Sequence, residues 1–349
     1  MNELRTFGWY ATRITPHLPK EAFSPAPSRL WGGLLYLLVA TLGIVVIGIL
    51  ALPVWANGLI SLVIGICFSG MSCLGHEILH GTVVRKRWIR NWLGAIAFMP
   101  LSVGPYLWTK WHNQTHHIHT QVEEKDPDHW ATYEQLLDRP IFHQMYKLPL
   151  VVRSIVHFCS LLILFTIFST KMFFNFIGAF KRKKQPFVYM QFIIPWAIWI
   201  GLLLCMGPVK WLFAYLIPLL ITNFILMCYI STQHNLNPLG DVNDPLVNTL
   251  SVTVPKWVDF LHFNFSYHTE HHIFPGMSSK YYPLVKEQIK RMWPESYHEL
   301  PFGKALLAIF KTPRVYAGNT ELIDPHQKKV YGLLGHGLDP RNIRPKEYK

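Results

Sequence analysis

The sequence predicts an all-α integral membrane protein, with four transmembrane helices in two hairpins and a cytoplasmic helical cap that carries groups of histidines. Three observations predict this fold. Charged residues make up 15% of the 349 residues, against about 25% in a typical soluble protein. Hydrophobic residues make up 50%, and the mean hydropathy is +0.20. Several of the 18 histidines fall into closely spaced groups next to the apolar stretches.

Four uncharged apolar stretches are long enough to cross a bilayer, which takes about 20 residues. They are residues 30–51, 56–75, 187–206 and 211–230. The linkers within the first two and within the last two are so short that each pair forms a tight helical hairpin. Two further apolar stretches, at about 92–108 and 148–168, contain prolines and glycines or a charge. We expect both to be interfacial helices, because the histidines that lie between them must stay on the cytoplasmic side.

The placement of Lys and Arg predicts the orientation. The two hairpin turns hold only Lys210, and nearly all other basic residues lie in the terminal segments and the central loop. Cytoplasmic loops carry the excess of Lys and Arg, so we expect both termini in the cytoplasm, in a bacterial inner membrane or the endoplasmic reticulum. The chain then divides into a cytoplasmic N-terminal segment (1–29), a membrane domain (30–283) and a cytoplasmic C-terminal region (284–349).

The formal charge of +13 does not indicate nucleic-acid binding. The basic runs at 85–87 and 181–184 directly flank apolar stretches, where they face the anionic headgroups of lipids. We therefore expect the membrane, and not a nucleic acid, to be the partner of these charges.

Three groups of histidines have the spacing of metal ligands on helices. They are His76 and His80; His112, His116 and His117; and His268, His271 and His272. Residues four apart lie on one helix face, so the first pair can bind a single ion. Neighbouring residues on a helix point about 100° apart, so each adjacent pair in the other two groups can serve two ions side by side.

The number of imidazoles predicts two metal ions. Imidazole is a common ligand of iron, zinc, copper and nickel. Zinc takes four ligands and iron about six, so eight or nine nitrogens exceed what one ion uses. Two ions with open positions can bind and reduce oxygen. Four carboxylates are placed to accept hydrogen bonds from the imidazole N–H groups, namely Glu77, Glu270, Asp126 and Asp128.

The three groups resemble the tripartite histidine signature of membrane fatty-acid desaturases and related hydroxylases. They read His-Glu-Ile-Leu-His at 76–80, His-Asn-Gln-Thr-His-His at 112–117 and His-Thr-Glu-His-His at 268–272. The segment 264–275 is similar to the family's third histidine box, and Asp-Pro-Asp at 126–128 resembles its acidic segment after the second. The resemblance spans roughly residues 30–283, including the four-helix layout.

The resemblance implies oxygen-dependent desaturation of the acyl chain of a lipid at a centre of two ferrous ions, with O2 as co-substrate. It also implies that His234, just after the fourth helix, completes the ligand set. No His-Pro-Gly-Gly haem motif occurs, so we expect electrons from a separate ferredoxin or cytochrome b5. A further hypothesis is that Tyr106, Trp108 and Trp111 frame a tunnel for the acyl chain.

Three alternatives compete with this interpretation. A hydroxylase or ketolase of the same superfamily, acting on an alkane, a carotenoid or another lipid, shares the histidine groups. Residues 76–80 alone match the His-Glu-x-x-His motif of an intramembrane zinc metalloprotease, which leaves the other two groups unexplained. A metal transporter would carry ionisable residues inside its helices, and the four apolar stretches contain none.

Overall fold

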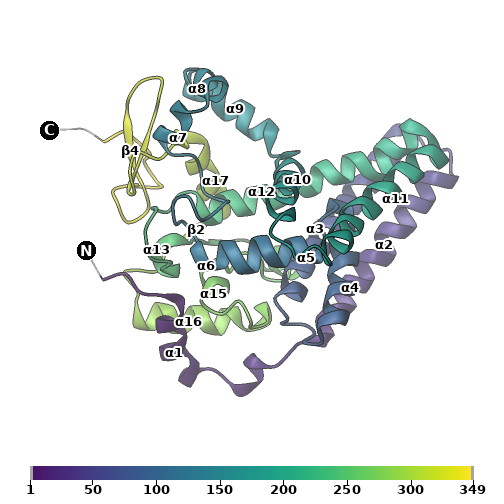
Figure 1. Ribbon diagram of the computed structural model, residues 1–349, viewed down its shortest axis with the longest axis horizontal. Coiled ribbons are helices and arrows are strands. Elements are labelled where there is room, and N and C mark those ends of the chain that lie inside the picture. The colour runs from purple at the N-terminus through teal and green to yellow at the C-terminus, as the bar shows by residue number, and fades with distance from the viewer. Residues whose placement is uncertain (1–2, 347–349) are drawn as a thin grey trace.

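The computed structural model describes residues 3–346, most of which lie in helices (Figure 1). The N-terminal part contains α1 (Phe7–Ile14), the short turns η1 (Thr15–His17), η2 (Lys20–Phe23) and η3 (Pro27–Arg29), and then α2 (Leu30–Ile49) and α3 (Val54–Leu79). These are followed by α4 (Arg87–Phe98), η4 (Met99–Leu101), α5 (Pro105–Trp108), the π-helix η5 (Thr109–His116) and α6 (His117–His119).

The central part contains α7 (Tyr133–Leu137), α8 (Pro140–Tyr146), α9 (Leu150–Ser160) and α10 (Leu164–Ile177). Next come α11 (Gln185–Trp211), the π-helix η6 (Leu212–Leu216) and α12 (Ile217–His234). The C-terminal part contains α13 (Pro245–Asn248), α14 (Lys256–Leu261), α15 (His268–Ile273), η7 (Ser279–Tyr281), α16 (Tyr282–Met292) and α17 (Phe302–Lys311).

Four short strands correct the prediction of an all-α fold. Strand β1 (Ser251–Thr253) pairs in parallel with β2 (Glu299–Pro301), and β3 (Glu321–Ile323) pairs antiparallel with β4 (Val330–Gly332). Each strand has three residues, which is too short for an alternating pattern to appear in the sequence. The sheet of β1 and β2 packs against the end of α12, with Val252 of β1 in one core with Tyr229, whereas β4 lies farther from the long helices (Figure 1).

The long helices α2, α3, α11 and α12 form a bundle that extends to one side of the molecule (Figure 1). Three helical stretches are long and apolar enough to cross a membrane: Pro27–Ile49, Val54–Leu79 and Gln185–His234. The third is interrupted at Gly207, whose φ of 78° and ψ of 166° are not helical. The rings of Trp199 and Tyr215 stack with centroids 4.0 Å apart, whereas a straight helix would place them about 24 Å apart. The chain therefore reverses here, as the predicted second hairpin requires.

The two hairpin turns lie next to each other. The Nζ atom of Lys210 in the second turn donates to the carbonyl oxygen of Gly48, at the end of α2, at 2.7 Å. The first turn occupies residues 50–53, two residues earlier than predicted. Pro53 disfavours a helical conformation for Leu52 and stands at the N-cap of α3.

The two stretches predicted as interfacial helices are each divided. In 92–108, α4 begins already at Arg87 and ends at Phe98, and a turn around Pro100 and Ser102 (φ 56°) precedes α5. Single helices were expected, but proline and a left-handed residue end a helix. In 148–168, α9 and α10 meet at an angle of 74°. This bent pair has the length and composition of a broken span or a re-entrant loop, so its interfacial placement stays a prediction.

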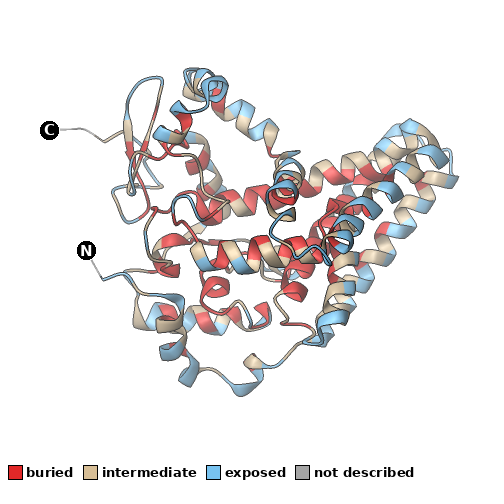
Figure 2. Cartoon of the chain, viewed as in Figure 1, coloured by how far each residue is buried: buried red, intermediate tan, exposed pale blue. Residues whose placement is uncertain are grey.

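Burial distinguishes α3 from α2 (Figure 2). In the most apolar part of Val54–Leu79, 67% of residues are buried, against 17% in Pro27–Ile49. Helix α3 is therefore the centre of the bundle, and α2 presents an apolar outer face that water would not favour. The proposed division between residues 283 and 284 passes through α16, whose Val285 and Ile289 pack in one core with Ile273 of α15.

Close packing around α3 depends on small residues. A Cβ atom at Gly65 would lie 2.8 Å from Cβ and Cγ2 of Ile221 in α12, whereas one at Gly58, in the same helix, would meet nothing within 4 Å. Small residues allow membrane helices to approach closely.

We predict that Gly65→Ala destabilises the protein by about 1–3 kcal/mol through overpacking against the branched Ile221 side chain. Gly58→Ala is the matched control, and it should leave the unfolding temperature in detergent unchanged or slightly higher. Equal unfolding temperatures for the two variants would show that α3 and α12 do not pack as described.

Candidate metal centre

The nine histidines predicted as metal ligands converge from four segments of the chain. They are His76 and His80 at the end of α3; His112, His116 and His117 in η5 and α6; His234 at the end of α12; and His268, His271 and His272 in α15. All are buried except His80, which is of intermediate exposure. The structure divides them into two clusters.

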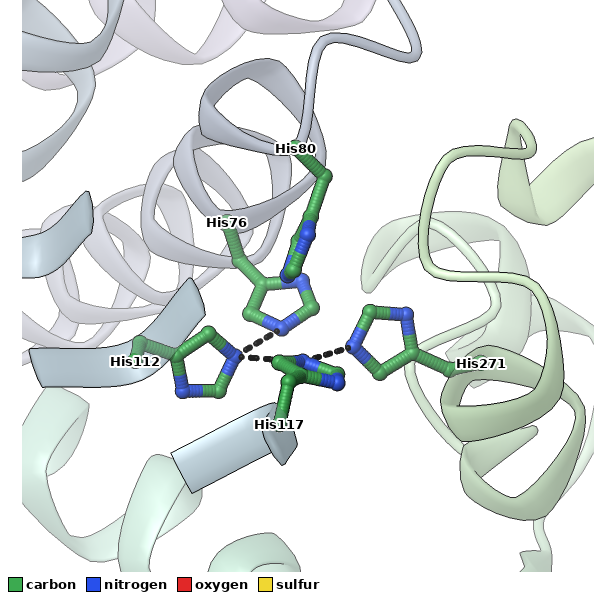
Figure 3. Close-up of side chains that lie close together, drawn as sticks. All are labelled: His76, His80, His112, His117 and His271. Atoms are coloured by element: carbon green, nitrogen blue, oxygen red, sulfur yellow. Dashed lines mark hydrogen bonds between the residues drawn. The ribbon is translucent and has the colours of Figure 1, made fainter. Parts of the chain in front are cut away.

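The first, which we call the five-histidine cluster, consists of His76, His80, His112, His117 and His271 (Figure 3). One ring nitrogen from each lies within 4.8 Å of the others. The Nε2 atom of His112 lies 2.9 Å from Nε2 of His76 and 3.1 Å from Nε2 of His117. The Nε2 atoms of His117 and His271 are 3.0 Å apart.

The second, the four-histidine cluster, consists of His116, His234, His268 and His272. Ring nitrogens of His116, His234 and His272 lie within 4.8 Å of one another. The Nε2 atom of His268 lies 2.6 Å from that of His234 and 3.1 Å from that of His272. The sequence neighbours at 116–117 and at 271–272 thus each divide between the two clusters, because adjacent side chains on a helix point in different directions.

The arrangement of the nitrogens fits metal ions in both clusters. The Nε2 atoms of His112, His117 and His268 each face two other Nε2 atoms, and a neutral imidazole has only one N–H to donate. Lone pairs that converge in this way need a cation between them. Nitrogens bound to one ion at about 2.1 Å lie about 3 Å from one another, which matches these separations. The Nε2 atoms of His80 and His116 are buried without a hydrogen-bond partner among the described residues.

Burial keeps most of these imidazoles neutral. It lowers the pKa of His80 to about 3, with a further contribution from nearby Arg90. It also lowers the pKa well below the ordinary value at five other cluster positions, where neighbouring histidines add to the effect: His112, His117, His268, His271 and His272. A neutral ring has a lone pair to give to a metal ion, so these side chains are ready to bind one at neutral pH.

The carboxylates of Asp126 and Asp128 both lie next to the ring of His116. The Nδ1 atom of His116 lies 2.9 Å from Oδ1 of Asp126 and 3.3 Å from Oδ2 of Asp128. Burial lowers the pKa of His116, but the two carboxylates outweigh burial and raise it to about 9. Hydrogen bonding through Nδ1 leaves Nε2 directed at the four-histidine cluster, and a metal ion bound there would displace any proton on Nε2.

Glu77 and Glu270 have other partners than the expected imidazoles. Glu77 accepts hydrogen bonds from Ser278 Oγ at 2.5 Å and pairs with Arg29 at 3.1 Å. It follows His76 on α3 and therefore points about 100° away from it. Glu270 accepts from Tyr297 OH at 2.5 Å. Each carboxylate connects a histidine-bearing helix to a segment that is distant in the sequence. Glu77 therefore positions α3 and Glu270 positions α15, and neither orients an individual imidazole ring.

Further side chains contact the cluster histidines in ways that the sequence did not predict. The hydroxyl of Tyr282 lies 2.9 Å from Nδ1 of His271, and Thr120 Oγ1 lies 3.3 Å from Nδ1 of His272. The ring of Trp108 stacks on His112 at 4.5 Å. Nothing in the histidine spacing points to Tyr282 or Thr120, because each belongs to a different segment from the ring it contacts.

Comparison with known proteins agrees with this geometry. The sequence model of the family described as "Fatty acid desaturase" matches residues 53–303, which include all nine histidines. The chain belongs to the fatty acid desaturase family. This finding confirms the resemblance of the three histidine groups to the desaturase signature.

Relatives in the fatty acid desaturase family match along most of the chain. The chain is 24% identical over 332 residues to the sn-1 oleoyl-lipid 12-desaturase of Synechocystis sp., covering 92% of this chain and 91% of that protein. It is 27% identical over 342 residues to the enzyme of the same name from Picosynechococcus sp., with 90% and 93% covered. It is 21% identical over 300 residues to the chloroplastic omega-6 fatty acid desaturase of Spinacia oleracea, with 81% and 64% covered.

We predict that Asp126→Asn weakens metal binding in this desaturase about 10- to 100-fold, since an amide orients His116 less strongly than a carboxylate. Metal content of the purified protein, measured by mass spectrometry after mild chelation, tests this. Glu123→Gln removes an exposed carboxylate of the same loop and should retain the metal. Equal metal content in both variants would contradict an orienting role for Asp126.

Proposed function

We propose that the chain is a membrane desaturase that removes two hydrogens from adjacent methylenes of the acyl chain of a glycerolipid, with O2 as co-substrate. The observation that carries this proposal is the convergence of nine histidines, eight of them buried, into two adjoining clusters. The names of the relatives support the acyl-lipid substrate, since two of those described above act on an oleoyl lipid.

Two iron ions are the metals that we propose for the clusters. The five-histidine and the four-histidine cluster would hold one each, and bound iron would supply the oxygen activation and hydrogen abstraction that amino-acid side chains lack. The carboxylates of Asp126 and Asp128 would keep His116 in the orientation for binding, and Tyr282 would do the same for His271. These residues act before any chemistry, by fixing the positions of the nitrogens.

A narrow cavity gives an approach to the five-histidine cluster. Its lining includes His76, His80 and His271, together with the aromatic side chains of Phe263 and Phe265. The cavity has a volume of about 20 Å³, well below the roughly 300–1,000 Å³ of a ligand site, so it would have to widen to admit an acyl chain. The two phenylalanine rings would then lie along that chain and exclude water. Whether Tyr106, Trp108 and Trp111 also frame the acyl path stays a hypothesis. It is supported for Trp108 by its contact with the ring of His76, at 5.8 Å between centroids.

The membrane arrangement belongs to the same proposal. Helices α2, α3, α11 and α12 would cross the bilayer as two hairpins, with both termini and the histidine clusters on the cytoplasmic side. The terminal segments 1–29 and 284–349 would then face the cytoplasm, where a separate ferredoxin or cytochrome b5 would deliver electrons. Contact of the N-terminal helix with the C-terminal segment supports a shared side, since the ring centroids of Tyr10 and Trp293 lie 5.0 Å apart.

The alternatives differ in product and in metal. A zinc protease would use His76, Glu77 and His80, but Glu77 is engaged by Arg29 and Ser278 and is not free to act as a general base. A hydroxylase or ketolase would use the same clusters, so only its product distinguishes it from a desaturase.

We predict that a host expressing the chain accumulates a new unsaturated acyl chain in its lipids, detected by mass spectrometry of intact lipids. His268→Ala should abolish the product, because it removes a ring that lies within 3.1 Å of two others in the four-histidine cluster. His119→Ala is the matched control and should keep the activity, since His119 belongs to neither cluster. A hydroxylated or keto product would refute the desaturase assignment.

A further inference from the structure

An apolar groove runs along the outer side of α3, between α2 and α4. Its lining includes Leu30, Leu34, Leu74, Ile78, Leu93 and Ile96. Its volume is about 380 Å³, which lies within the range of about 300–1,000 Å³ found for ligand sites. Its outer edge is formed by exposed apolar side chains, with Leu34 and Ile96 each 44% exposed. The groove is therefore open toward the region that lipid would occupy.

The groove and the histidine cavity lie on opposite faces of the same helix. Leu74 and Ile78 of α3 line the groove, whereas Cys73, His76 and His80 line the cavity. One helix thus separates a lipid-facing apolar groove from the approach to the five-histidine cluster.

The rims of the two spaces come close to each other at the turn η3, where residues next to the groove contact residues of the cavity. Pro27, the first residue of η3, and Leu30, which follows the turn, line the groove. Arg29 between them donates from Nε to Glu77 at 3.1 Å, and Glu77 lines the cavity. The backbone N–H of Ala26 also donates to the carbonyl of Thr82, another cavity residue, at 2.9 Å. A molecule with two apolar arms that branches near η3 can therefore place one arm in each space.

Basic side chains gather at this same end. Arg85, Lys86, Arg87 and Arg90 lie in the linker from α3 and the first turn of α4. Arg85 donates to the carbonyl of Phe23 in η2 at 2.6 Å, which places the linker beside η3. None of the four pairs with a carboxylate among residues 3–346, and Nε of Arg90 is buried without a partner. These cations are available to an anionic headgroup.

Two exposed tryptophans place the end of the groove at a membrane interface. Trp31, which lines the groove, is 74% exposed, and Trp88, beside the basic residues, is 58% exposed. Tryptophan is enriched at the headgroup level of membranes. Charge, apolar groove and interfacial aromatics together fit a lipid lying with its headgroup near η3.

We propose that the groove holds the non-reacting acyl chain of an anionic diacyl glycerolipid, while its second chain enters the histidine cavity. This inference rests on the proposed function and deepens it. It makes a two-chain lipid the substrate, in preference to a thioester with a single acyl chain, because only the former occupies both spaces. The single chain would leave the groove unused.

Photo-crosslinking tests the groove without any need for turnover. The full-length protein is placed in nanodiscs that contain phosphatidylglycerol with a diazirine in either the sn-1 or the sn-2 chain. One of the two probes should label Leu34, Ile96 or their groove neighbours. The matched outer positions Leu38 and Leu42 of α2, which are 58% and 64% exposed, should be labelled less. Equal labelling of groove and outer positions by both probes would overturn the proposal, because it indicates surrounding lipid only.

A substitution that fills the groove should lower the activity on a diacyl lipid more than the activity on a lipid with a single acyl chain. Ile96→Trp displaces about two methylene groups of a bound chain, which corresponds to about a tenfold loss in kcat/KM for a diacyl substrate. Its activity on the lysolipid with the same reactive chain should stay within about twofold of the wild type. Leu38→Trp should change neither activity. Equal losses on both substrates would overturn the proposal.

Two outcomes separate this inference from the proposed function. Selective labelling of the groove in a protein that desaturates no lipid would support the groove and refute the desaturase assignment. Desaturation of diacyl lipid without selective labelling would support the desaturase assignment and refute the groove. Leu34→Trp fills the same groove from α2 and replaces Ile96→Trp if that variant loses its fold, as judged from its unfolding temperature.

Discussion

The structure depends on nine histidines whose imidazole rings lie close together. These rings have too few N–H groups for all of their neighbouring nitrogens to form hydrogen bonds with one another. Their nitrogens lie about as far apart as ligands of a common ion, and burial keeps most of the rings outside the membrane helices neutral. Such a cluster is costly to form unless cations fill it, because each buried nitrogen loses its hydrogen bonds to water. The polar side chains around the clusters, such as Asp126, Glu77 and Glu270, hold the segments that carry the histidines.

The helical bundle makes this convergence possible. Helix α3 packs against both α2 and α12, and its last turn carries His76 and His80 into the first cluster. Helix α12 ends with His234 in the second cluster. Two apolar helices thus deliver ligands at the boundary between the helical bundle and the folded C-terminal part. The same boundary lets an apolar groove and a metal centre lie on opposite faces of one helix.

Long apolar stretches and histidine spacing made much of this arrangement predictable. The helices α2 and α3, the reversal near Gly207 and the nine converging histidines follow from signals that extend over many residues. The partners of Glu77 and Glu270 could not be predicted, because Ser278 and Tyr297 come from segments whose positions only the tertiary fold determines. The short strands and the turn between α4 and α5 were missed because three-residue strands leave no periodic pattern, and the apolar character of 92–108 conceals the effect of Pro100.

X-ray absorption spectroscopy at the iron edge, combined with metal content per chain, tests the central claim most directly. Two irons per chain, surrounded by nitrogen and oxygen atoms and lost in a variant that replaces His112 and His268 together, would agree with one ion in each cluster. A single zinc per chain, or iron bound by sulfur, would contradict it.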